Sequence, residues 1–260
     1  MIGAIIGDTV GSVYEFNNTK DYNFRIFGTG SCYTDDTIMS LAVAEWLIQD
    51  PCHTLEKLEA TMVDFAKRYP CPKGGYGGGF YNWLFNSPSG RHPYGSWGNG
   101  SAMRVSAVGW FFDTLEETER VAKISAEITH NHPEGIKGAQ ATAAAIWMAR
   151  NGRSKEEIRE YVETAYGYDL HRSWEELHRT YGWDGSCQGT VPEAIICFLE
   201  SKDFEDSIRK SVSIGGDSDT LACINGSIAE AFYRDIPEYM IERTVGLLPA
   251  EFRQILEKLG

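Results

Sequence analysis

Apolar residues recur along this chain at the three- and four-residue spacing of amphipathic helices. After Thr34 they fall at Ile38, Leu41 and Trp46, which predicts a helix that begins at the threonine. A second helix is predicted over 55–68, where two prolines follow soon after its end. The same spacing predicts further helices over 101–112, 115–128, 133–150, 156–166, 192–199, 204–213, 220–232, 238–247 and 249–258.

Alternating strand patterns are scarce, and no strand–helix–strand rhythm is present. The sequence therefore predicts an all-α fold: one compact domain over 1–260, built from roughly a dozen helices packed at steep angles. Residues 70–100 differ, because Gly, Pro, Asn and Ser alternate there with aromatic residues. We predict a long ordered loop in this segment, with room for a small hairpin.

The N-terminal segment carries small residues at the spacing of a tightly packed helix, at Gly3, Gly7 and Gly11. Asp8 lies within this apolar helix and is expected to be buried and paired rather than catalytic. Glu15 follows, and taken alone it is typical of a solvated surface acid.

The charge balance narrows the function classes. With 24 Lys and Arg against 37 Asp and Glu, the formal charge is −13, which disfavours binding of bare nucleic acid. No apolar stretch approaches the ~20 residues of a membrane span, and the short N-terminal apolar segment lacks a basic leader. Six scattered cysteines indicate neither a zinc site nor a disulfide framework, so we expect a cytoplasmic protein.

Two acidic segments stand at predicted helix entrances, YTDDT at 33–37 and GGDSDT at 215–220. Either one alone is explained by helix capping, since Thr and Asp satisfy free backbone N–H groups. If both entrances meet in the fold, four carboxylates converge, and their repulsion requires a cation. Their ligands are hard oxygens without His or Cys, which favours Mg²⁺, Mn²⁺ or Ca²⁺ over zinc, and two ions would suit this many ligands.

Taken together, these segments resemble the ADP-ribosylglycohydrolase family. The matching stretches run from end to end in the family's order: GAIIGDTVGSVYEF (3–16), YTDDTIMSLAVAEWL (33–47), YGSWGNGSAMRVSAVG (94–109), ITHNHPEGIKGA (128–139), GTVPEAI (189–195) and SIGGDSDTLACINGSIAEAFY (213–233). TDDT paired with a late GGDSDT is the most specific part of the resemblance.

The resemblance implies an all-α hydrolase with a binuclear Mg²⁺ centre, or Mn²⁺ in its place, that cleaves a glycosidic bond between ADP-ribose and an acceptor. Its implied metal ligands are Thr34, Asp35, Asp36, Asp217, Asp219 and Thr220. Its implied catalytic carboxylates are Glu15, Asp36 and Asp219, of which Glu15 and Asp219 are the candidates for proton transfer. Such a hydrolysis passes through an oxocarbenium-like state, for which two metals can bind the sugar hydroxyls and activate water.

The resemblance also implies a substrate cradle, formed by Gly95, Ser96, Trp97, Gly98, Asn99, Gly100 and His130. Its backbone amides would approach the diphosphate. These residues also have structural explanations. The glycines can form a plain turn, Trp97 can be a core residue, and His130 can be a structural histidine whose ring is hydrogen-bonded to backbone. Tyr76, Gly78 and Phe80 are interpreted as a packed surface loop, with a lid over the adenosine as the alternative. Arg104, in an apolar helix, is expected to pair with a buried acid.

Two other functions stay open: a non-catalytic ADP-ribose-binding module, and a metal-dependent nucleotide phosphohydrolase. Intact Asp and Thr ligands argue against the first. The acceptor stays open as well, between an arginine or serine side chain of a modified protein and a small ADP-ribose conjugate. We expect a monomer.

Overall fold

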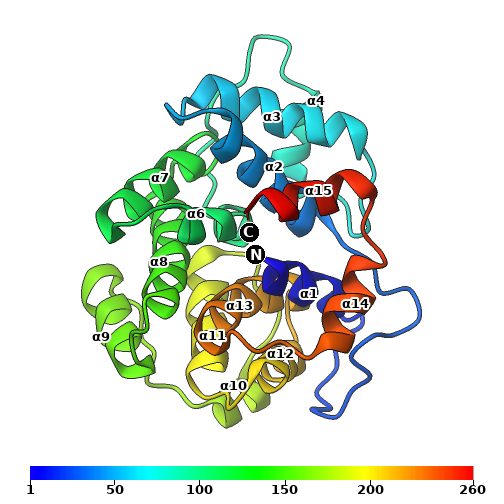
Figure 1. The fold of residues 1–260 in the computed structure, drawn as a ribbon, viewed down its shortest axis with the longest axis vertical. Helices are drawn as coiled ribbons and strands as arrows, with labels where there is room; N and C mark the ends of the chain where they lie inside the picture. The colour runs from blue at the N-terminus through cyan, green and yellow to red at the C-terminus, as the bar shows by residue number, and fades with distance from the viewer. Residues whose placement is uncertain (260) are drawn as a thin grey trace.

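The computed structural model describes residues 1–259, and within them it contains helices and no strands beyond two isolated bridges. The all-α prediction is confirmed (Figure 1). No helix in this described part is long and apolar enough to cross a membrane. The helices are α1 (Ile2–Gly11), α2 (Asp35–Gln49), α3 (Leu55–Arg68), α4 (Gly78–Phe85), α5 (Gly100–Met103), α6 (Ser106–Phe111), α7 (Leu115–Glu127), α8 (Pro133–Arg150), α9 (Lys155–Tyr166), α10 (Trp174–Thr180), α11 (Cys187–Leu199), α12 (Phe204–Ser213), α13 (Ser218–Tyr233), α14 (Glu238–Val245) and α15 (Ala250–Leu259).

The first helix packs backbone to backbone against α13. An ideal Cβ on Gly7 would lie 1.9 Å from the carbonyl oxygen of Ala222, and one on Gly11 would lie 2.4 Å from that of Ser218. Gly3 meets the carbonyl of Gly226 in the same way, at 2.4 Å. No side chain fits along this seam, so the glycines at every fourth position are what allow the two helices to touch. The contact brings the N-terminal segment beside the GGDSDT turn.

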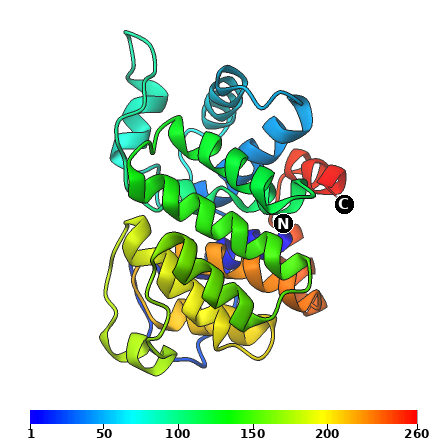
Figure 2. The same cartoon turned by 90° about the vertical axis from the view of Figure 1, so that its left-hand side faces the viewer.

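Helix α8 separates two hydrophobic clusters and contributes to both. Ala139 and Ala143 face the cluster formed with α2, α3 and α7, whereas Ala141 and Ala145 face the cluster formed with α1, α11 and α13. Figure 2 shows α8 as the long green helix that runs between the upper and lower parts of the molecule. The small side chains let both clusters approach the helix closely.

Most predicted helices are confirmed to within a few residues, and four regions differ. The glycine-rich segment holds a helix, α4, in which Phe80, Trp83 and Leu84 are buried at helical spacing, and it holds no hairpin. Helix α10 was not predicted, because its one buried residue, Leu177, gives no apolar stripe.

The other differences concern helix ends. The predicted helix over 101–112 divides into α5 and α6, since Arg104 and Val105 have ψ angles of −2° and −4° that interrupt the regular turn. Helix α11 begins at Cys187 rather than at Pro192, because Ser186 accepts a hydrogen bond from the amide of Gly189 and caps an earlier turn.

Candidate functional site

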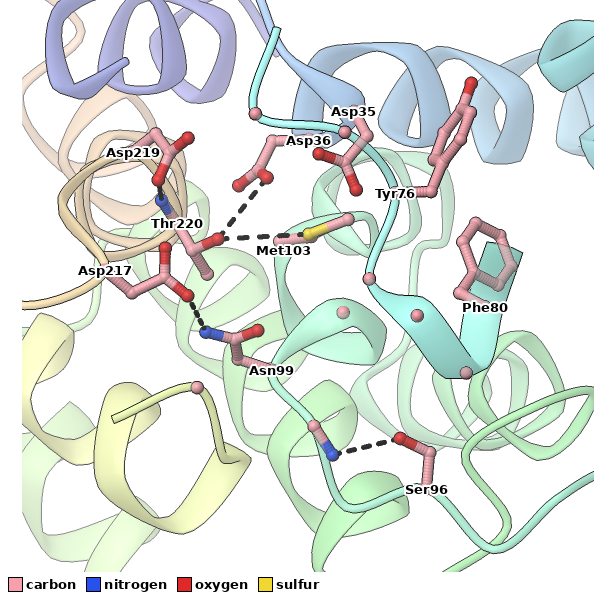
Figure 3. Close-up of a pocket in the computed structure, with 18 of the residues that line it drawn as sticks. Asp35, Asp36, Tyr76, Phe80, Ser96, Asn99, Met103, Asp217, Asp219 and Thr220 are labelled. Atoms are coloured by element: carbon pink, nitrogen blue, oxygen red, sulfur yellow. Dashed lines mark hydrogen bonds between the residues drawn. The ribbon is translucent and has the colours of Figure 1, made fainter. Parts of the chain in front are cut away.

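The two acidic segments line one cleft, with a cavity volume of about 370 Å³ (Figure 3). One wall carries carboxylates from both ends of the chain, and the facing wall carries the glycine segments. The lining residues include Glu15, Asp35, Asp36, Tyr76, Phe80, Ser96, Gly98, Asn99, Gly100, Met103, Arg104, His130, Trp183, Asp217, Asp219 and Thr220.

Asp8 of α1 holds the TDDT segment by hydrogen bonds. Its carboxylate accepts hydrogen bonds from the Thr34 amide at 2.9 Å, the Thr34 hydroxyl at 2.8 Å and the Thr37 amide at 3.1 Å. The Thr37 hydroxyl donates to it as well. Asp8 is thus buried and paired with backbone amides, which fixes the start of α2 relative to α1.

Thr34 and Asp36 differ in role: Thr34 caps α2, whereas Asp36 faces the cleft. The Thr34 hydroxyl oxygen accepts a hydrogen bond from the Asp36 amide and caps α2, and its side chain is fully buried behind the cleft lining. The Asp36 carboxylate instead faces the cleft and accepts a hydrogen bond from the Thr220 hydroxyl at 3.3 Å. Its Oδ1 atom is buried and has no hydrogen-bond partner among residues 1–259.

The GGDSDT turn directs Asp217 away from a capping role. Gly215 and Gly216 both have φ of +78°, a left-handed conformation that favours glycine, and Asn18 hydrogen-bonds both the amide and the carbonyl of Gly216. Asp217 stands at the N-cap of α13, yet its side chain makes no capping bond. Its carboxylate accepts from Asn99 Nδ2 at 2.7 Å, so it faces the cleft.

Glu15 completes the acidic wall. One carboxylate oxygen from each of Glu15, Asp217 and Asp219 lies within 4.8 Å of the other two. A Cβ on Gly74 would lie 2.8 Å from Glu15 Oε2, so the glycine loop packs directly against this carboxylate. Burial, followed by the charge of Asp217, raises the pKa of Glu15 to about 7.

The remaining carboxylates of this wall also favour protonation when no cation is bound. Burial, with the neighbouring Asp8 charge next in importance, raises the pKa of Asp35 and Asp36 well above their usual range. Burial and the Asp217 charge do the same to the pKa of Asp219. None of these groups forms an ion pair with a Lys, Arg or His of residues 1–259.

These observations fit the divalent ions that the sequence implies. The donor set is oxygen only, the carboxylates form no ion pair with a described residue, and Asp36 Oδ1 is a buried acceptor without a donor. The charge of Lys73 acts on Glu15 and Asp219, yet the pKa of both carboxyl groups stays raised. A hard cation such as Mg²⁺ or Mn²⁺ would suit these oxygen donors, neutralise the crowded carboxylates and give Asp36 Oδ1 a partner. The fold thus brings Asp35, Asp36, Asp217, Asp219 and Thr220 to one cleft, whereas Thr34 lies behind them.

The facing wall is held in place by backbone contacts with the segment just before α11. The Asn99 amide donates to the carbonyl of Gly185 at 2.9 Å, and Gly98 forms an isolated bridge with Ser186. The Gly98 amide donates to Ser96 Oγ at 3.2 Å. Ser96, Gly98, Asn99 and Gly100 therefore line the cleft as an ordered strip, and His130 lies beside them.

Two of the predicted substrate residues do not line the cavity. Gly95 donates its amide to Asn131 Oδ1 at 2.7 Å, and Trp97 is 54% exposed with its ring centroid 5.5 Å from that of His132. Trp97 is therefore not a core tryptophan, and an adenine stacked on it would lie outside the cavity.

Several lining residues were missed or misjudged from the sequence. Tyr76 and Phe80 form part of the cleft wall, which corrects their interpretation as a surface loop. Arg104 reaches the cleft and pairs with no acid among the described residues, contrary to prediction. Phe16 and Trp183 lie at the rim, 76% and 61% exposed, and no sequence pattern marked either of them.

Comparisons with known proteins agree with this architecture. The family model for ADP-ribosylglycohydrolase matches residues 1–260. ADP-ribosylhydrolase ARH3 of Homo sapiens is 27% identical over 90% of this chain and 84% of its own length. An uncharacterized protein of Archaeoglobus fulgidus is 28% identical over 98% of this chain and 92% of its own.

The fold has a counterpart among solved structures. A protein described as an ADP-ribosylglycohydrolase-related protein complex superposes with a TM-score of 0.71, covering 95% of this chain and 94% of its own, at 23% identity. That likeness concerns the fold, whereas the family model spans the whole sequence. The chain therefore belongs to the ADP-ribosylglycohydrolase family and is a glycohydrolase.

Proposed function

We propose that this protein is a Mg²⁺-dependent hydrolase that releases ADP-ribose from a modified acceptor by cleaving the glycosidic bond at C1″. The observation that carries the proposal is the convergence of Asp36, Asp217, Asp219 and Thr220 from two distant helix entrances in one cleft. A wall of glycines and a buried histidine faces them across the same cavity. Acidic oxygens suit a metal and a sugar diol, and the facing strip suits a diphosphate.

The metal would be held by Asp35, Asp36, Asp217, Asp219 and Thr220, with two ions as the family resemblance implies. Bound there, Mg²⁺ or Mn²⁺ would supply Lewis-acid activation of a water and of the ribose hydroxyls. Asn99 holds the Asp217 carboxylate toward the cleft, and Thr220 holds that of Asp36, so the ligand set is oriented before any ion arrives.

Glu15 is positioned to move the proton. Hydrolysis forms a bond from the water oxygen to C1″ and breaks the bond from C1″ to the acceptor atom, while one proton passes from the water to the leaving group. Glu15 is half-buried and lines the cleft beside the predicted metal ligands, which places a carboxyl group where it can accept the proton and donate it. Asp219, within 4.8 Å of Glu15, is the second candidate.

The acceptor would leave past the rim at Phe16 and Trp183. Phe16 directly follows Glu15, and both aromatic rings line the cleft while remaining open to solvent. An arginine or a serine side chain carrying ADP-ribose would both fit such a rim. Whether the enzyme prefers an arginine or a serine linkage is therefore a question for an assay with peptides that differ only in the modified residue.

The test is Mg²⁺-dependent release of ADP-ribose from matched arginine- and serine-linked peptides, with Asp217→Asn as the inactive control. We expect free ADP-ribose with Mg²⁺ and none with EDTA. AMP or inorganic phosphate as the product would instead identify a phosphohydrolase. Tight binding without any product, on both peptides and on a small ADP-ribose ester, would identify a binding module and contradict the proposal.

A further inference from the structure

Arg104 is a buried cation without a counter-charge. It is 1% exposed, it lines the cleft, and it forms no ion pair with any acid of residues 1–259. Its Nη2 donates to the carbonyl of Ser125 at 2.9 Å and to the hydroxyl of Thr129 at 3.0 Å, and its Nε has no partner. Burying a guanidinium in this way is costly, so a compensating anion in the cleft is expected.

The contact with Thr129 fixes the direction of a hydrogen-bond chain. A guanidinium can only donate, so the Thr129 oxygen accepts from Arg104. The Thr129 hydroxyl proton is then free for another acceptor, and the remaining described partner is Nδ1 of His130, 2.7 Å away. The hydroxyl therefore donates to Nδ1, which leaves the proton of the neutral imidazole on Nε2.

The protonated nitrogen faces the substrate strip. His130 is 4% exposed, and its Nε2 would lie 3.2 Å from a Cβ on Gly100 and 3.6 Å from one on Gly98. Nε2 makes no hydrogen bond to any of residues 1–259, so its donor capacity is available in the cleft. Burial, followed by the charge of Arg104, holds the pKa of His130 well below its usual range, and the ring stays neutral.

We propose that Arg104 and Thr129 are positioning residues that set His130 as a neutral Nε2–H donor for the diphosphate of the substrate. Arg104 adds a positive charge without an acidic partner behind that donor, which suits the two negative charges of the diphosphate that bridges adenosine and ribose in ADP-ribose. This inference rests on the proposed function and assigns roles to two residues outside the acidic wall. The chain runs Arg104 Nη2 to Thr129 Oγ1 to His130 Nδ1, entirely through buried atoms.

The first test is the tautomer of His130, read from the ¹⁵N shifts of its ring nitrogens in the full-length protein at neutral pH. We expect a protonated Nε2 and an unprotonated Nδ1 in the unmodified protein and in Thr129→Ser. Thr129→Val, which removes the hydroxyl at nearly constant volume, should release this preference. A protonated Nδ1 in the unmodified protein would overturn the proposal, and this reading needs no variant to fold.

The second test is the affinity for ADP in EDTA, measured by calorimetry, because ADP carries the diphosphate without the glycosidic bond to an acceptor. We expect Thr129→Val to raise the Kd about tenfold, as expected for the loss of one oriented hydrogen bond, and Thr129→Ser to stay within about twofold. Thr142→Val is the matched control, since Thr142 is a buried threonine of α8 whose hydroxyl has no partner. Unchanged ADP binding by Thr129→Val would contradict the inference.

Neither readout requires turnover, so the two proposals fail separately. Absence of ADP-ribose release would overturn the proposed function while the tautomer and ADP affinity still report on Arg104 and Thr129. Conversely, normal hydrolysis with unaltered ADP binding by Thr129→Val would leave the function standing and remove the positioning role.

Discussion

Asn99 Nδ2 donates to Asp217 Oδ2 across 2.7 Å, and this hydrogen bond joins the two walls of the cleft. The backbone amide of Asn99 is held by Gly185, so the side chain has a fixed origin. The Asp217 side chain makes no capping hydrogen bond, although the residue stands at the N-cap of α13. One contact thus orients a predicted metal ligand from the glycine strip.

Replacing Asn99 by Ala should lower kcat/KM for ADP-ribose release by about 10- to 100-fold, since a hydrogen bond to a charged group contributes about 1.5–3 kcal/mol. Asn99→Asp should cost more, because it places a second carboxylate against Asp217. The measurement is steady-state kinetics over a Mg²⁺ titration, with Asn151→Ala as an exposed control remote from the cleft. Activity of Asn99→Ala equal to that of the control would show that Asp217 needs no such support.

The sequence showed two acidic helix entrances, because residue types at helix starts are visible in it, but their meeting in one cleft was expected only from the family resemblance. It could not separate capping from ligation, since the answer differs within one motif: Thr34 caps α2 while Asp36 faces the cleft. The orientation of Asp217 depends on Asn99, which is 118 residues away and reaches it only in the folded chain.

Arg104 is a second residue whose partners could not be predicted from the sequence. Its apolar neighbours predicted burial, which is confirmed, and general energetics predicted an acidic partner, which is wrong. The partners are a backbone carbonyl and Thr129, both supplied by α7 and the turn after it. Tertiary contacts of this kind have no signature in a single sequence. Trp97 is a further case, because a tryptophan in a glycine-rich segment fits a core position as well as a rim.

Asp36→Asn and Asp217→Asn should each abolish detectable turnover while leaving the far-ultraviolet circular dichroism unchanged. Both replacements keep the side-chain volume and place a group that cannot ionise in a crowded acidic wall, so the metal-free variants should melt no lower than the unmodified protein. Addition of Mg²⁺ should then raise their melting temperature little or not at all. Asp64→Asn, on the exposed side of α3, is the matched control and should behave as the unmodified protein does. Substantial turnover by either cleft variant would refute the assignment of these ligands.

The stability of the metal-free protein should fall as the pH rises from about 5 to about 8. Burial raises the pKa of Glu15 to about 7 and those of Asp36 and Asp219 well above their usual range, so the folded state binds protons that the unfolded state has released. Stability from such groups is present at low pH and is lost as the pH passes their folded-state pKa values.

Magnesium should reverse that trend, because it binds the ionised carboxylates and its affinity grows as their protons leave. At about 100 times its Kd a ligand adds about 2.7 kcal/mol, so the shift in melting temperature should be on the order of 5–10 °C at about pH 7.5 and smaller at about pH 5.5. Thermal unfolding in EDTA and in Mg²⁺ at both pH values measures the effect. A magnesium shift that is equal at both values would rule out proton-linked binding at these groups.

Alanine substitutions in the close contact between α1 and α13 should all lower stability, but only the one near the cleft should also lower activity. A Cβ on Gly11 would lie 2.4 Å from the Ser218 carbonyl oxygen and 2.5 Å from the Asp219 Cα, so Gly11→Ala pushes directly on a cleft residue. A Cβ on Gly3 meets the Gly226 carbonyl oxygen at the same 2.4 Å, two helical turns away from the cleft. Each substitution should lower the free energy of unfolding by about 1–3 kcal/mol, as overpacking does.

The two variants should differ in function, because only Gly11→Ala displaces Asp219. We expect Gly3→Ala to keep a near-normal kcat per folded molecule and Gly11→Ala to lose at least about tenfold. Urea unfolding gives the folded fraction, and kinetics at saturating Mg²⁺ well below both unfolding midpoints gives the rate. Equal rates in two equally destabilised variants would mean that the position of Asp219 tolerates movement of α13, and that the close helix contact stabilises the fold without shaping the site.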